Sequence, residues 1–197
     1  ERDEHIVFYP NGHKYTISTD PKSKYTSVTT WIHKQFPEFN SDKVIDNIFK
    51  SKKWNPSHKY WGMSKTEIKN EWARSGAENA ALGTEMHERI EFFMNRLSDA
   101  THESLLKTET AEPSNTEWQY FLEFIKDFPE MRPYRTEWMV YHEDKKLAGS
   151  IDMVYIHPDG ELSIYDWKRS KDITRDNWGE YGITDKFKNM PHCNYWH

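Results

Sequence analysis

The chain has 197 residues, enough for one well-packed domain, and its aromatic fraction of 15% supplies core volume despite a hydrophobic fraction of only 36%. No apolar run approaches the ~18 residues of a membrane-spanning helix and no basic-then-apolar leader is present, so we expect no membrane segment and no signal peptide. The single cysteine, Cys193, excludes an internal disulfide and a cysteine-ligated zinc or iron–sulfur site, and it favours an intracellular setting. The formal net charge of −5 leaves nucleic-acid binding open, because bound cations reverse the sign of the charge at an acidic site.

The first elements in chain order are a hairpin and a short helix. Alternating apolar positions over 5–17 flank the turn Pro10-Asn11-Gly12, which predicts two antiparallel strands. The segment 25–31 is rich in Ser and Thr and is expected to cap a helix over 32–36. That helix should end near Pro37.

Helices dominate the next part of the sequence. Ser41 is expected to cap a helix whose apolar positions recur at a period of 3.6, and 51–63 should form an irregular aromatic connection. Residues 65–97 are mostly helical in pattern, with a break expected near Gly83. A further helix is expected to start at 113–115, with an inward face formed by Trp118, Phe121, Leu122 and Ile125.

The pattern then changes to strands, over 135–141, 148–157 and 161–168. Pro158-Asp159-Gly160 joins the last two and suits a tight hairpin with glycine in the left-handed position. Helices followed by strands predict a single α/β or α+β domain with an antiparallel strand group.

The hairpin register brings two carboxylates together. It pairs Val154 with Ile164 and sets Asp152 opposite Asp166, with Cβ atoms roughly 5 Å apart. Side chains alternate along a strand, so the aspartates share a face with Val154, Ile156, Leu162 and Ile164, and we expect that face to look into the core.

Two adjacent carboxylates destabilise a sheet unless a proton, a basic group or a cation offsets their repulsion. Lys168 follows Asp166 by two positions and projects from the same face. Such a set can hold Mg²⁺ or Mn²⁺ and position an attacking water, with Lys168 orienting the water or neutralising a phosphoryl group. The alternative is a structural Asp–Lys–Asp cluster at a sheet edge.

The helical segment 83–91, GTEMHERIE, adds a second candidate group. His87 and Glu91 are four residues apart and share a face beside the apolar stripe, where they could complete a metal shell. Taken alone, His87 is as well explained as a partly exposed helix residue.

Taken together, GTEMHERIE, Glu137, GSID ending at Asp152 and YDWK ending at Lys168 resemble the PD-(D/E)XK nuclease superfamily. The resemblance spans about 25–168 and is strongest to the RecB-like branch with viral and phage exonucleases and the mitochondrial genome maintenance exonuclease. It implies that His87, Asp152, Asp166 and the backbone carbonyl of Trp167 bind metal, that Lys168 is catalytic, and that Glu137 lies near the metals.

Substrate contacts are a weaker expectation. Arg169, Lys171 and Arg175 follow the catalytic lysine and could meet phosphates, and Trp31 could stack on a base. For each of them the alternative is a solvated charge or a core aromatic.

We therefore expect a restriction-endonuclease-like α/β core, with a small mixed sheet flanked by helices and an N-terminal helical portion. The whole chain, 1–197, should be one nuclease domain, with an N-terminal hairpin and helices over 1–75 and a catalytic core over 76–197 that ends before the family's last helix and its QxxxY-like motif. The expected activity is hydrolysis of DNA with two Mg²⁺ or Mn²⁺ ions, favouring exonuclease action on single-stranded or duplex ends in replication, recombination or repair. The alternatives are a DNA or RNA endonuclease, an inactive nucleic-acid-binding module of the same fold, and a structural protein with an incidental acidic cluster.

Overall fold

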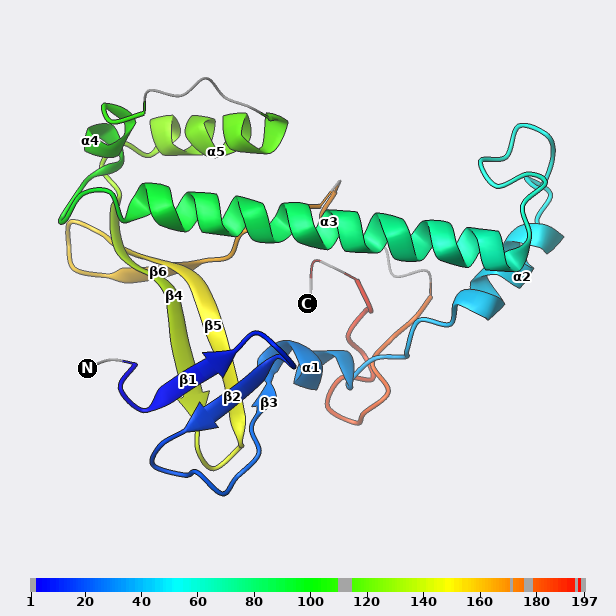
Figure 1. Ribbon diagram of the computed structural model, residues 1–197, viewed down its shortest axis with the longest axis horizontal. Helices are drawn as coiled ribbons and strands as arrows, with labels where there is room; N and C mark the ends of the chain where they lie inside the picture. Colours follow the sequence, from blue (N-terminus) through cyan, green and yellow to red (C-terminus); the bar gives the residue numbers. More distant parts are fainter. Residues whose placement is uncertain (1–2, 110–114, 171, 176–178, 194, 196–197) are drawn as a thin grey trace.

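The computed structural model describes residues 3–109, 115–170, 172–175, 179–193 and 195. A long helix crosses a small twisted sheet, a hairpin packs near one end of that sheet, and a helical arm extends away at the other end of the helix (Figure 1). This mixed architecture confirms the predicted fold class. Among the described residues, no helix has both the length and the apolar character that crossing a membrane requires.

The N-terminal hairpin forms as predicted. Strand β1 (Ile6–Tyr9) pairs antiparallel with β2 (Lys14–Ile17), which sets Ile6 opposite Ile17. The following helix begins earlier than expected, because Ser27 itself caps α1 (Val28–His33) by accepting the backbone N–H of Thr30. The Ser/Thr-rich segment is therefore partly helix, after a two-residue strand, β3 (Thr26–Ser27).

The main sheet is mixed and is centred on β5 (Leu147–Ile156). Strand β4 (Arg132–His142) runs antiparallel along one edge of β5. The other edge pairs with β3 in parallel at the start of β5 and with β6 (Leu162–Tyr165) in antiparallel at its end. Between these two pairings lies the stretch of β5 that carries Asp152.

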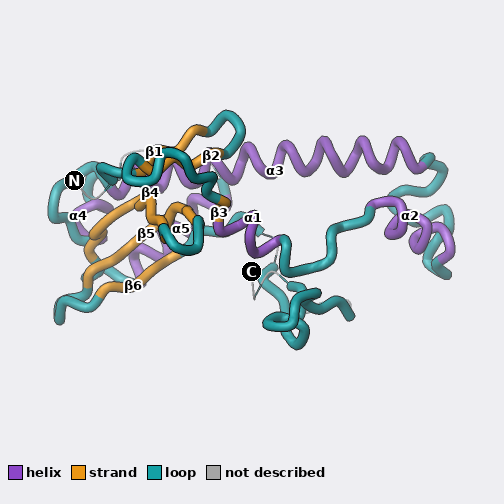
Figure 2. The backbone as a smooth tube through the Cα atoms, turned by 90° about the horizontal axis from the view of Figure 1, so that it is seen from below, coloured by secondary structure: helices purple, strands orange, loops and turns teal. Residues whose placement is uncertain are grey.

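Helix α3 (Lys65–Met94) is the long helix that crosses the sheet. Helix α2 (Ser41–Lys50), the connection after it and the start of α3 form the arm. Asn40, rather than Ser41, caps α2. The expected break near Gly83 is wrong, since α3 is continuous over its whole length, and it begins with a capping box between Ser64 and Glu67. Residues 51–63 form turns without a helix or strand, as predicted (Figure 2).

Two more helices follow α3. The short helix α4 (His102–Leu106) has no counterpart among the sequence predictions. Helix α5 (Thr116–Asp127) is capped by Asn115 and buries the predicted inward face of Trp118, Phe121, Leu122 and Ile125. Positions 113 and 114 of the predicted start lie outside the described residues.

The main core lies between α3, α5 and one face of β5 and β6. It includes Phe93 and Met94 of α3 together with Met153 and Tyr155 of β5, which are all almost fully buried. A second, smaller core joins the β1–β2 hairpin to the start of β5.

The predicted register between β5 and β6 is confirmed, with Val154 opposite Ile164 and Ile156 opposite Leu162. The predicted facing is correct for Val154 of β5, which is 2% exposed, and wrong for β6. Leu162 is 50% and Ile164 69% exposed, whereas the alternate residues Met153 and Tyr155 are buried and Tyr165 packs against the main core. Both faces of this hairpin carry apolar residues. The alternation of side chains therefore identified the two faces, but it did not show that the face with Met153, Tyr155 and Tyr165 packs against the main core.

Candidate metal centre and active site

Three elements bring a histidine and two carboxylates together. His87 of α3 lies 3.7 Å through Nδ1 from Glu137 Oε1 of β4, and 3.7 Å from Asp152 Oδ2 of β5. One ligand atom from each of these residues lies within 4.8 Å of the other two. The group is half-buried, with Asp152 the least exposed member at 13% of its side chain.

The strand register explains how the two carboxylates meet. Thr136 pairs with Met153 and Trp138 with Ile151, so Glu137 lies directly opposite Asp152. Glu137 has a φ of 42°, a left-handed conformation that is rare for a residue other than glycine and costs on the order of 1–3 kcal/mol. Ser150 holds the side chain by donating from Oγ to Glu137 Oε2 at 3.1 Å.

The backbone of Trp167 fixes both His87 and Asp152. Its N–H donates to Asp152 Oδ2 at 2.8 Å, and its carbonyl lies 2.9 Å from His87 Nε2. A carbonyl can only accept, so Nε2 carries a proton and, in the neutral ring, the lone pair of Nδ1 faces Glu137 and Asp152. The Trp167 side chain is anchored in turn by edge contacts with Phe121 and Phe124.

The electrostatics of the group favour a cation at its centre. The Glu137 carboxylate, 3.7 Å from Nδ1, joined by the charge of Asp152, raises the pKa of His87 above its ordinary value of 6.5 despite partial burial. Burial raises the pKa of Asp152, and the nearby charge of Asp166 raises it further. Negative charge from Glu137 and Asp152 therefore gathers around Nδ1 of His87, where a bound cation would offset it.

The donor set fits a divalent cation. Oxygen ligands with one imidazole suit Mn²⁺ and Mg²⁺. Donor atoms 3.7 Å from His87 Nδ1, in a group whose ligand atoms all lie within 4.8 Å of one another, could converge on one such ion. A backbone carbonyl that fixes the remaining N–H of a histidine is also the usual support for a metal-ligating imidazole.

Asp166 and Lys168 lie just outside this group. Lys168 Nζ is 2.6 Å from Asp166 Oδ2, and both side chains are more than half exposed. The structure therefore brings together His87, Glu137 and Asp152, with the Asp166–Lys168 pair beside them. The Trp167 carbonyl orients His87 in this arrangement.

The other predicted contacts have local partners. Arg169 pairs with Glu117 at 2.9 Å and bonds to Asn79 of α3. Arg175 stacks on Tyr195 and donates to its hydroxyl. Trp31 packs edge-on against Phe187. Lys171 lies outside the described residues, and Glu91 is not part of the three-residue group, although burial and the charge of Glu137 raise its pKa.

Sequence reasoning missed the residues that support the site. Ser150 could have been found, because it lies two positions before Asp152 and so on the same side of its strand. Asn79 and Glu117 could not, because only the fold brings α3 and α5 to Arg169. A cavity of about 820 Å³ adjoins this region, between α3, α5 and the segment 167–170.

One comparison with known proteins gives a match. Residues 32–181 match the family model described as PD-(D/E)XK nuclease superfamily. This range includes His87, Glu137, Asp152, Asp166 and Lys168. No curated protein and no solved structure matches the chain.

Proposed function

The chain belongs to the PD-(D/E)XK nuclease superfamily, and we propose that it hydrolyses phosphodiester bonds in DNA at the His87–Glu137–Asp152 group with Mg²⁺ or Mn²⁺. The observation that carries the proposal is the convergence of one imidazole and two carboxylates within 4.8 Å, beside the Asp166–Lys168 pair. Divalent ions at such a site lower the pKa of bound water and neutralise phosphate charge.

The protein's own groups have distinct roles in this proposal. His87, Glu137 and Asp152 would hold one ion. Asp166, which is more exposed, would either add a ligand to that ion or bind a second ion. The Trp167 backbone orients His87 and Asp152 through the two hydrogen bonds described above. The Lys168 ammonium pairs with Asp166 at 2.6 Å, but its side chain is more than half exposed, so it can turn toward a phosphate and orient the attacking water or stabilise the charge that develops.

The mode of attack is proposed from resemblance. The order of GTEMHERIE, Glu137, GSID and YDWK favours the RecB-like branch, and with it exonucleolytic processing of DNA ends inside the cell, in replication, recombination or repair. An endonuclease would use the same chemistry on an internal bond.

Cleavage of end-labelled DNA tests the proposal. Single-stranded and duplex substrates are incubated with Mn²⁺, Mg²⁺ or EDTA, for the unaltered chain and for Lys168→Ala and Lys145→Ala. Lys145 is an exposed lysine in the turn between β4 and β5, so it controls for the loss of one charge. We expect metal-dependent cleavage that falls by at least ~10²-fold in Lys168→Ala and persists in Lys145→Ala.

The size of the products separates the two modes. Exonuclease action releases short products from one end at the earliest times, whereas endonuclease action gives long internal fragments first. Equal activity in Lys168→Ala, or cleavage that continues in EDTA, would refute the proposed site.

A further inference from the structure

The arm formed by α2 and the start of α3 carries a concentration of positive charge. No acidic residue occurs between Asp46 and Glu67, whereas this interval contains five lysines, in a chain whose formal net charge is −5. The five are Lys50, Lys52, Lys53, Lys59 and Lys65. Such segregation of charge is a feature of nucleic-acid binding surfaces, which need a local basic region and not a basic total.

The structure leaves most of this charge available. Lys50, Lys52 and Lys53 are exposed, and within the part of the chain that the structure describes none of them has an ion-pair partner. Lys65 is neutralised by Asp46 at 2.6 Å, and Lys59 approaches Glu71 only to 4.0 Å. The free lysines lie at the end of α2 and the start of the connection to α3.

Aromatic rings lie among these lysines. Trp61 is 46% exposed, and its ring lies 5.2 Å from that of Trp54, which in turn packs 4.7 Å from Phe49. Exposed rings among cations are the feature by which proteins bind single-stranded nucleic acid, since bases stack on the rings while cations neutralise the phosphates.

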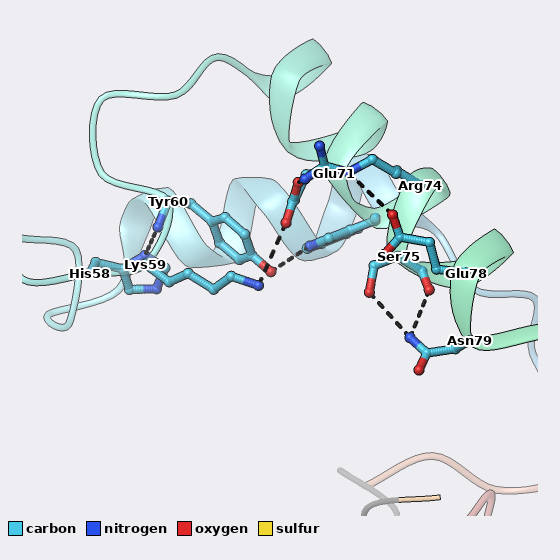
Figure 3. A network of polar contacts seen from close by, with 9 residues as sticks. His58, Lys59, Tyr60, Glu71, Arg74, Ser75, Glu78 and Asn79 are labelled. Carbon is cyan, nitrogen blue, oxygen red and sulfur yellow. Dashed lines mark hydrogen bonds and ion pairs between the residues drawn. The ribbon is translucent and has the colours of Figure 1, made fainter. Parts of the chain in front are cut away.

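The connection is held in a defined conformation by α3. Figure 3 shows Lys59 and Tyr60 pointing from the connection toward the helix. The Trp72 indole N–H donates to the Tyr60 hydroxyl at 2.8 Å, and His58 accepts the backbone N–H of Tyr60 at 3.2 Å. An ordered surface loses less conformational entropy on binding than a flexible loop would.

The arm lies far from the metal-binding group. His87 follows Lys65 by about six turns of α3, roughly 33 Å at 1.5 Å per residue, and Figures 1 and 2 both show α2 at the end of α3 remote from the sheet. This separation corresponds to about ten nucleotides at the 3.4 Å rise of one strand of B-form DNA, and to fewer in a stretched strand.

We infer that the arm is a second DNA-binding site, which holds a single strand through Lys50, Lys52, Lys53 and the exposed ring of Trp61 while the strand's end lies at the metal-binding group. The inference rests on the proposed function for the identity of its ligand. It adds a contact that no residue of the proposed active site supplies, and it predicts that affinity depends on substrate length.

Binding without hydrolysis tests the arm directly. The change in anisotropy of fluorescein-labelled oligo(dT) in EDTA is measured at several salt concentrations, for strands of about 6 and about 20 nucleotides. The arm variant combines Lys50→Ala, Lys52→Ala and Lys53→Ala. The control combines Lys14→Ala, Lys22→Ala and Lys24→Ala, which removes the same charge from exposed positions in and after the N-terminal hairpin.

We expect the arm variant to bind the longer strand on the order of tenfold more weakly and to lower the slope of log K against log salt by about 2, which is three contacts at ~0.7 each. Trp61→Ala should weaken binding without changing that slope. The loss should be smaller for the short strand, and the control variant should change neither quantity by more than about twofold. Far-UV circular dichroism checks that each variant is folded.

Equal losses in the arm and control variants would mean that net charge alone acts, and would overturn the inference. An unchanged salt slope in the arm variant would overturn it as well. Failure of the proposed function has a different signature, because it is the absence of metal-dependent cleavage while binding to the arm remains measurable.

Discussion

At the scale of single residues, His87 has two competing states. Its ring is held between a backbone carbonyl and two carboxylates, a setting that favours the protonated form and raises its pKa. A metal ion requires the neutral ring, and it also requires Asp152 in the ionised form that burial disfavours. Protons and metal therefore compete at both residues.

This competition predicts that metal affinity rises with pH. Because the folded pKa of His87 lies above 6.5, the ring loses its proton only as the pH rises through that higher value, and affinity for Mn²⁺ should increase most there. Isothermal titration calorimetry with Mn²⁺ at about pH 6, 7 and 8 measures the dependence, and proton release on binding should be seen at the lower values. Affinity that is constant across this range would contradict the assignment of His87 as a ligand.

The source of the shift can be tested in the metal-free protein. The Glu137 carboxylate makes the largest contribution to the raised pKa of His87, so Glu137→Gln should lower that pKa, which an NMR titration of the ring protons would measure. Glu88→Gln is a suitable control, because Glu88 is an exposed neighbour on the same helix that does not contribute to the pKa of His87. An equal pKa in both variants would argue against the contact between His87 and Glu137.

At the scale of elements, the sequence predicted the pairing of strands joined by a tight turn better than the pairing of strands whose contacts are long-range. Pro158-Asp159-Gly160 allows few hairpin geometries, so the register of β5 against β6 could be predicted, and with it the place of Asp152. Glu137 was expected near the metals only from family resemblance. Its membership of the group depends on the pairing of β4 with β5, which involves long-range contacts that no local pattern encodes.

Helix α3 shows why one local signal was misleading. Glycine disfavours a helix by only about 1 kcal/mol relative to alanine, and the residues around Gly83 are strong helix formers, so the helix continues through it. Between Ile68 and Ile90, a stretch that the structure describes completely, no residue of α3 is buried. Here the helix depends on its own propensity more than on packing.

Replacing the two glycines in this stretch should therefore stabilise the protein. A Cβ at Gly76 or Gly83 would meet no atom within 4 Å. Gly76→Ala and Gly83→Ala should each add up to about 1 kcal/mol, or about 2–4 °C in Tm. Thermal denaturation followed by circular dichroism measures this, and a lower Tm would show that the stretch bends in solution.

The same two variants differ in their distance from the site. Gly83 lies one turn before His87 on the same face, so its new methyl group projects toward the approach to the metal-binding group. We expect Gly83→Ala to raise the KM for DNA, and Gly76→Ala, two turns further away, to leave it unchanged. Equal KM values would mean that no part of the substrate passes close to Gly83.

At the scale of the whole molecule, the hairpin and the long helix α3 are packed in two different hydrophobic cores. The main core holds the end of α3 against β5, a second core holds the hairpin, and the arm extends beyond both. The sequence indicated one domain with a small mixed sheet. Its net charge of −5 concealed the basic arm, because a total does not record where charges lie.

Since His87, Glu137 and Asp152 come from α3, β4 and β5, a bound ion would tie the long helix to two strands, and Mn²⁺ should stabilise the entire fold. At a concentration of 100 Kd the gain is about 2.7 kcal/mol, or about 5–10 °C in Tm, and EDTA should reverse it. Asp152→Asn should abolish the gain, whereas Asp144→Asn, in the exposed turn between β4 and β5, should preserve it.

The folded pKa of Asp152 is raised, so its ionisation above that pKa costs stability. Metal-free Asp152→Asn should therefore have a higher Tm than the unaltered chain at neutral pH. A gain from Mn²⁺ that persists in Asp152→Asn would mean that the ion binds elsewhere. A metal-free variant that is more stable but no longer responds to Mn²⁺ would show that the protein retains the Asp152 carboxylate for metal binding at the expense of its own stability.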